Sequence, residues 1–220
     1  MNDPRRRSSI PSIFLILALA TTAVAFALYF RPSASSTAST VLESSGTVRV
    51  VSGKKALAFL PLRSQGCGLV FYPGARVPAE AYAYLGRALA ERGHTTLIAR
   101  FPLGMAVFAK DRAGMLITDH PEVDAWMIAG HSLGGAMAAS WLRDHRGAAR
   151  GLILLASFPP GSVNLAESGL RVLQLSASMD GLVAPAASAA SRALLPKNTR
   201  FVVLEGGNHA NFGEYGRQDG

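Results

Sequence analysis

Short runs of apolar residues recur along the chain from residue 47 and alternate with longer stretches in which apolar positions lie three or four residues apart. The short runs predict β-strands, and the longer stretches predict amphipathic α-helices. We expect strands at residues 47–51, 56–60, 68–72, 95–99, 125–129, 151–155, 171–175 and 200–204. We expect helices at residues 78–92, 105–118, 133–146 and 184–195.

The apolar runs of the expected strands are nearly continuous, which is typical of strands buried on both faces. Strands that alternate with helices favour an α/β fold, with a mostly parallel, twisted sheet and helices on both of its faces. We expect this domain to cover residues 46–220, a length that leaves no room for a separate cap domain.

The N-terminal region has a different pattern. Residues 13–30 carry no charge, and a helix of this length spans about 27 Å, close to the hydrocarbon thickness of a bilayer. They therefore predict one transmembrane anchor. The basic segment 1–12, with Arg5, Arg6 and Arg7, predicts a cytoplasmic N-terminus and an extracytoplasmic domain. Residues 31–45 are rich in Ser, Thr and Ala and predict a flexible tether.

A cleavable signal peptide is the alternative to this anchor. Residues 18–20 and 25–27 read Ala-Leu-Ala and Ala-Phe-Ala, which resemble cleavage sites. The apolar stretch is longer than in most signal peptides, so we favour the uncleaved anchor. Under the alternative the domain is secreted, and both interpretations place it outside the cytoplasm.

The charge and composition limit the classes of binding partner and cofactor that we expect. The formal net charge is +8, but from residue 45 onward the basic residues are scattered and accompany no recognition motif, so we expect no nucleic-acid partner. Attraction to anionic lipid headgroups accounts for the excess of basic residues more simply. His, Cys, Asp and Glu form no cluster with the spacing of metal ligands, so we expect neither a metal nor an organic cofactor.

Residues 130–134 read Gly-His-Ser-Leu-Gly, between the strand at 125–129 and the helix that follows. A G-x-S-x-G turn in this setting exposes its serine at the end of a sheet, so Ser132 is the candidate nucleophile. Glycine is needed at Gly130 and Gly134 because side chains there would collide across the bend. We expect His131 to pack against or orient this turn rather than to transfer a proton.

A serine nucleophile needs a base to take its proton and a carboxylate to orient that base. His209 follows the last expected strand and Asp180 follows the strand at 171–175, so both are expected at the edge of the sheet where Ser132 lies. The chain order Ser, Asp, His agrees with such a triad. Glu205 is the rival of Asp180, because it also ends a strand and is close to His209.

The oxyanion that forms during acyl transfer needs two hydrogen-bond donors. The backbone N–H of Leu133, at the start of the helix, is one candidate. The second is expected in the loop after the strand at 68–72, where we place it at Ala75, with Gly74 as the next choice.

Four stretches carry a family resemblance: Phe-Tyr-Pro-Gly-Ala at 71–75, Gly-His-Ser-Leu-Gly-Gly at 130–135, Ser-Met-Asp-Gly-Leu-Val at 178–183 and Gly-Gly-Asn-His-Ala-Asn-Phe-Gly at 206–213. With their spacing, they resemble small single-domain bacterial α/β hydrolases near the dienelactone-hydrolase and carboxylesterase-like group, over residues 47 to about 216. The resemblance implies hydrolysis through an acyl-enzyme, without specifying the substrate.

The chain departs from this family in one respect. A helix normally follows the histidine loop in such folds, whereas this chain ends eleven residues after His209. We therefore expect no C-terminal helix, and either a fragment or a last strand that lacks cover on one face.

Together these features predict a membrane-anchored serine hydrolase of the carboxylesterase type, which cleaves a small-molecule ester, thioester or lactone with Ser132, His209 and Asp180. Two alternatives stay open: acyl transfer to a second alcohol by the same triad, and a non-catalytic hydrolase-like module that only binds. The acyl group, the alcohol and the oligomeric state are left undefined at this point.

Overall fold

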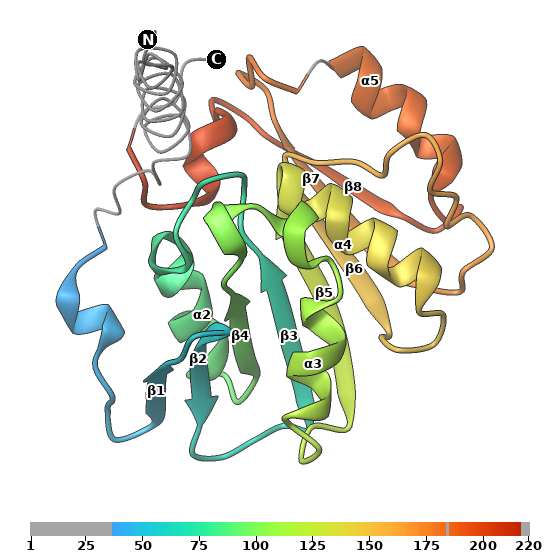
Figure 1. Cartoon of the computed structure of the whole chain (residues 1–220). Coiled ribbons are helices and arrows are strands. Elements are labelled where there is room, and N and C mark those ends of the chain that lie inside the picture. Colours follow the sequence, from blue (N-terminus) through green and yellow to red (C-terminus); the bar gives the residue numbers. More distant parts are fainter. Residues whose placement is uncertain (1–36, 184, 217–220) are drawn as a thin grey trace, which may run out of the picture. The chain divides into compact units, whose positions relative to one another are not determined.

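An eight-stranded sheet forms the centre of the domain (Figure 1). The structure is a computed structural model and describes residues 37–183 and 185–216. The strands lie in the order β1-β2-β4-β3-β5-β6-β7-β8. Their bounds are β1 Val48–Ser52, β2 Ala56–Pro61, β3 Cys67–Tyr72, β4 Thr95–Ala99, β5 Ala125–His131, β6 Gly151–Leu155, β7 Arg171–Ala177 and β8 Arg200–Leu204.

The helices of the described residues include both α-helices and short 3-10 helices. The α-helices are α2 Ala83–Ala90, α3 Arg112–Thr118, α4 Leu133–Asp144 and α5 Pro185–Ala190. The 3-10 helices are η1 Ser39–Leu42, η2 Ala79–Tyr82, η3 Pro102–Gly104, η4 Ala106–Ala109, η5 Ser191–Leu194 and η6 His209–Phe212.

The sheet is mostly parallel, as the alternation of strands and helices predicted. Strands β3 to β8 pair in parallel, and only β1 and β2 run antiparallel to their neighbours. Every expected strand overlaps an observed one. The short apolar runs were therefore sufficient to locate the sheet.

Helices cover both faces of the sheet (Figure 1). Helices α3 and α4 lie over a core that includes Trp126 and Trp141, while α2 lies over a second core that includes Phe59 and Phe71. The helix that follows β3, α2, therefore packs on one face of the sheet, and the helix that follows the neighbouring strand β5, α4, packs on the other face. In open α/β sheets, ligands bind at the carboxyl ends of strands that diverge in this way.

The helix expected at 105–118 is shorter than predicted, because only its second half forms α3. The hydroxyl of Tyr72 accepts a hydrogen bond from the N–H of Ala113 at 2.9 Å. A continuous helix would give this N–H to the carbonyl of Ala109. A side chain from β3 thus replaces a helical hydrogen bond at the point where α3 begins.

Part of the predicted tether 31–45 is packed against the domain. Val41, in η1, is buried, and its carbonyl accepts hydrogen bonds from Nε and Nη2 of Arg87 at 3.0 and 2.9 Å. The expected basic segment 1–12 and membrane segment 13–30 lie outside the described residues. Within the described ranges, no helix has the length and apolar character to cross a bilayer.

Strand β8, at the edge of the sheet, contains no buried side chain. Phe201 is 36% exposed and Val203 is 50% exposed. The guanidinium of Arg192 lies 4.5 Å from the centroid of the Phe201 ring and gives it partial cover. This agrees with the expectation that the last strand has incomplete cover.

Four non-glycine residues of the described chain have a positive φ. They are Arg76 (61°), Leu103 (53°), Ser132 (53°) and Ala156 (42°). Each lies in the segment that follows a different parallel strand, β3, β4, β5 or β6. Strained backbone therefore gathers at the carboxyl edge of the sheet.

Candidate active site

The turn after β5 holds Ser132 with φ 53° and ψ −127°, and α4 begins at the next residue. This is the strained strand-to-helix turn that the motif predicted. A Cβ atom at Gly130 would lie 2.5 Å from the backbone nitrogen of Gly135, across the bend. A Cβ atom at Gly134 would lie 2.2 Å from the carbonyl oxygen of Tyr72. The two glycines therefore let the turn close and pack against the end of β3.

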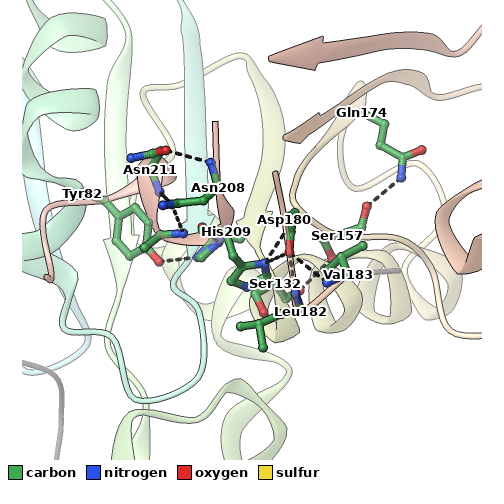
Figure 2. A network of polar contacts seen from close by, with 12 residues as sticks. Tyr82, Ser132, Ser157, Gln174, Asp180, Leu182, Val183, Asn208, His209 and Asn211 are labelled. Atoms are coloured by element: carbon green, nitrogen blue, oxygen red, sulfur yellow. Dashed lines mark hydrogen bonds and ion pairs between the residues drawn. The ribbon is translucent and has the colours of Figure 1, made fainter. Parts of the chain in front are cut away.

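Asp180 and His209 form a buried pair after β7 and β8 (Figure 2). Nδ1 of His209 lies 2.9 Å from Oδ2 of Asp180 and 3.1 Å from its Oδ1. The side chains of His209 and Asp180 are 2% and 4% exposed. In a neutral ring, a hydrogen bond donated from Nδ1–H to the carboxylate places the ring proton on Nδ1 and the lone pair on Nε2. This is the tautomer that a general base for serine requires.

Backbone groups also hold the carboxylate of Asp180 in place. Its Oδ1 accepts hydrogen bonds from the N–H groups of Leu182 and Val183, at 2.9 and 2.8 Å. Glu205, the rival predicted from the sequence, is exposed. Among the described residues it makes no hydrogen bond to His209. The geometry therefore favours Asp180 as the partner of the histidine.

A reciprocal cap fixes the backbone at His209, the first residue of η6. Oδ1 of Asn208 accepts a hydrogen bond from the N–H of Asn211 at 3.1 Å, and Oδ1 of Asn211 accepts one from the N–H of Asn208 at 2.7 Å (Figure 2). Neither asparagine was assigned a role from the sequence. The Asn-x-x-Asn spacing, which resembles a capping box, was the available signal.

In the described part of the chain, Ser132 and His209 form no hydrogen bond with each other, and Oγ of Ser132 takes part in none. Catalytic hydrogen bonds of this kind are often long in the free enzyme and tighten in the complex with substrate. The structure thus joins two of the three predicted triad residues directly and places the third after β5, which β6 separates from β7 in the sheet.

The loop after β3 contains Ala75 and Gly74, the two candidates for the second oxyanion donor, and its hydrogen bonds distinguish them. The N–H of Gly74 donates to the hydroxyl of Tyr82 at 3.0 Å, so it is not available to a substrate oxygen. The two amides after Ala75 donate to backbone carbonyls. Within the described residues, the amides of Ala75 and Leu133 donate to no protein group. The geometry therefore favours Ala75 and Leu133 over Gly74 as donors.

His131 lies beneath the nucleophile turn and is 1% exposed. Its Nδ1 is 2.8 Å from the hydroxyl of Tyr82, and its Nε2 is 3.0 Å from the carbonyl oxygen of His209. Burial, together with the nearby His209, lowers the pKa of His131 to about 3, so the ring is neutral at pH 7. These contacts orient the turn. The sequence did not reveal a role for Tyr82, which lies within the helix expected at 78–92.

Ser157 and Gln174 support the nucleophile turn at its backbone (Figure 2). Oγ of Ser157 donates to the carbonyl of Ser132 at 2.7 Å, and Nε2 of Gln174 donates to the carbonyl of Ser157 at 2.8 Å. These partners are 25 and 17 residues apart. Because no local motif links residues at such separations, neither residue could be singled out from the sequence.

A cavity of about 360 Å³ lies beside Ser132, within the range of small-molecule sites. Its lining is mainly apolar and consists of Ser132, Leu133, Ala136, Ala156, Ser157, Phe158, Pro160 and Val183. Among the residues that the structure describes, no three His, Cys, Asp or Glu side chains come together as metal ligands would.

The strand order, the strained serine turn and the buried Asp–His pair all agree with the resemblance noted in the sequence. The sequence profile of the alpha/beta hydrolase family matches residues 68–220. The chain belongs to the alpha/beta hydrolase family. This membership supports a hydrolase, with the mostly parallel sheet that the structure shows. No curated protein sequence matches this hydrolase.

Several solved structures share the fold of this hydrolase. The esterase domain of a Rhodothermus marinus protein has a TM-score of 0.59 at 15% identity, over 74% of this chain and 90% of that one. A predicted CIB-like hydrolase from Thermoplasma acidophilum has a TM-score of 0.56 at 15% identity, over 74% and 87% of the two chains. A serine hydrolase homologue from Coxiella burnetii has a TM-score of 0.51 at 19% identity, over 76% and 90%. At these identities the likeness establishes the fold alone.

Proposed function

We propose that this hydrolase is a serine esterase that cleaves a carboxylic ester, thioester or lactone through an acyl-enzyme. The observation that carries the proposal is the buried hydrogen-bonded pair of His209 and Asp180, which accompanies a strained serine turn in the same domain. A histidine held by a carboxylate in this tautomer has one lone pair to use as a base.

In the proposed mechanism, Oγ of Ser132 attacks the substrate carbonyl while Nε2 of His209 takes the serine proton. Asp180 stabilises the imidazolium, and the amides of Leu133 and Ala75 donate hydrogen bonds to the oxyanion. His209 then returns the proton to the leaving alcohol or, from a thioester, the leaving thiol. A water molecule, deprotonated by the same histidine, attacks the acyl-enzyme, and the acid leaves as Ser132 regains its proton.

The cavity beside Ser132 supports an uncharged, apolar group on the substrate, because its lining is mainly apolar. We further propose that residues 13–30 anchor the enzyme in the membrane with the catalytic domain on the outer side. This placement rests on the charge and hydropathy of the sequence.

The test compares full-chain wild-type protein with Ser132→Ala on p-nitrophenyl esters of graded chain length, in a mild detergent. Ser140→Ala is the matched control, since this buried serine only donates to the carbonyl of Ala136 within α4. We expect Ser132→Ala to lower kcat by about 10⁴-fold or more and Ser140→Ala to retain activity.

A fluorophosphonate probe gives a second readout of the nucleophile. It should label the wild-type protein and Ser140→Ala, and leave Ser132→Ala unlabelled. Retained hydrolysis by Ser132→Ala would overturn its assignment. A folded wild-type protein that neither hydrolyses esters nor reacts with the probe would indicate the non-catalytic alternative.

A further inference from the structure

The hydroxyl of Tyr82 and the ring of His131 connect the loop after β3 to His209, the proposed base. We call this loop the oxyanion loop, because it contains the proposed donor Ala75. Oη of Tyr82 lies 3.0 Å from the backbone nitrogen of Gly74 and 2.8 Å from Nδ1 of His131. Nε2 of His131 lies 3.0 Å from the carbonyl oxygen of His209. The residues Tyr82, His131 and His209 are each at most 2% exposed. Three consecutive hydrogen bonds thus run through a region without solvent.

The two ends of this chain of hydrogen bonds fix its direction. The N–H of Gly74 can only donate, so it donates to Oη of Tyr82, and the carbonyl of His209 can only accept, so it accepts from Nε2–H of His131. A neutral imidazole with its proton on Nε2 accepts at Nδ1. The hydroxyl proton of Tyr82 therefore points to Nδ1 of His131.

Close packing leaves little freedom around these bonds. A Cβ atom at Gly74 would lie 2.8 Å from Nδ1 of His131, so only glycine allows the loop to approach the ring. The rings of Phe71 and Tyr82 have centroids 4.5 Å apart, and those of His131 and His209 are 4.7 Å apart.

Each residue in the chain of hydrogen bonds adjoins one part of the proposed machinery. Gly74 precedes the oxyanion donor Ala75, His131 precedes the nucleophile Ser132, and His209 is the base itself. We propose that Tyr82 and His131 are positioning residues that hold the oxyanion loop, the nucleophile turn and the base in one fixed arrangement. This inference rests on the proposed esterase function.

The test is Tyr82→Phe, which keeps the ring and removes the hydroxyl that both Gly74 and His131 use. We expect kcat for a p-nitrophenyl ester to fall about 10- to 100-fold, somewhat less than after complete loss of an oxyanion donor. KM should change less than about threefold, because the apolar cavity does not include Tyr82. A kcat within twofold of wild type would overturn the proposal.

Tyr72→Phe is the matched control. The hydroxyl of Tyr72 is also buried and also bonds two backbone groups, the N–H of Ala113 and the carbonyl of Lys110, but both belong to the segment around the start of α3. We expect a similar fall in melting temperature for both variants and a loss of kcat only for Tyr82→Phe. Equal losses of kcat in the two variants would indicate a general structural effect and overturn the proposal.

A measurement on the wild-type protein does not depend on activity or on a variant that folds. The ¹⁵N chemical shifts of His131 should show a neutral ring with its proton on Nε2. A proton on Nδ1 would overturn the proposed direction of the hydrogen bonds. Wild-type protein as inactive as Ser132→Ala would refute the proposed function and, with it, the positioning role. An active wild type with an unaffected Tyr82→Phe variant would refute only the positioning role.

Discussion

The side chains of Asp180 and His209 meet at 2.9 Å although the residues are 29 positions apart, whereas Glu205, only four positions from His209, is exposed. This relationship predicts which carboxylate orients the base. Asp180→Asn should lower kcat by about 10³- to 10⁴-fold, because it disturbs the tautomer of His209. Glu205→Gln should leave kcat within twofold of wild type. Steady-state kinetics on a short-chain ester measure both, and the reverse pattern would assign the role to Glu205.

The close approach of Gly134 to the end of β3 predicts a steric effect on stability. In Gly134→Ala, the new methyl group would lie 2.2 Å from the carbonyl oxygen of Tyr72, so the backbone must move. We expect a loss of about 1–3 kcal/mol or more in the free energy of unfolding. Gly161→Ala is the control, because a Cβ atom there meets nothing within 4 Å. Chemical denaturation of both variants tests this, and equal stabilities would contradict it.

The buried ring of His131 predicts a pH dependence of stability. Its pKa falls from the ordinary value of 6.5 to about 3 in the folded protein, so between these values the unfolded chain binds a proton that the folded chain does not. The free energy of unfolding therefore decreases as the pH falls through this window, by up to about 1.4 kcal/mol per pH unit.

Chemical denaturation at pH 6.5 and pH 4.5 measures this dependence in wild-type protein and in His131→Asn. The variant lacks the imidazole, so its loss of stability between the two pH values should be smaller by about 2 kcal/mol. Because each protein is compared with itself at the two pH values, the effect of the substitution on stability at a single pH cancels. Identical losses would show that His131 titrates normally.

The apolar cavity predicts a change in chain-length preference. Ala136, on α4, lines the cavity, and Ala136→Leu would fill part of it. We expect kcat/KM for long-chain p-nitrophenyl esters to fall about tenfold or more, with a smaller change for the acetate. Ala148→Leu is the control at an exposed position outside the lining. A uniform change across all chain lengths would indicate that the acyl group binds elsewhere.

Much of the fold and the core of the site followed from local sequence patterns. The apolar runs located the strands, and the positions of Ser132, Asp180 and His209 after strands placed them at one edge of a parallel sheet. These features are local in the chain or depend only on topology, so a single sequence was sufficient to propose them.

The remaining features depend on side chains that meet across long separations. Tyr82 and His131 are 49 positions apart, and the hydroxyl of Tyr82 accepts a hydrogen bond from the N–H of Gly74, which favours Ala75 over Gly74 as an oxyanion donor. Tyr72 and Ala113 are 41 positions apart, and their hydrogen bond explains why the helix expected at 105–118 begins late. Hydropathy patterns describe which side chains are buried, but not where a buried hydroxyl points.

The four positive φ angles after β3, β4, β5 and β6 also bear on the thermal robustness of the enzyme. Each such residue costs about 1–3 kcal/mol, and glycine would relieve that cost. The substitutions that would most directly relax the backbone therefore fall on the edge that carries Ser132. Ser132→Gly, for example, should melt at a higher temperature than the wild-type protein while losing the proposed nucleophile. At Ser132, heat resistance and the proposed reactivity therefore favour different residues.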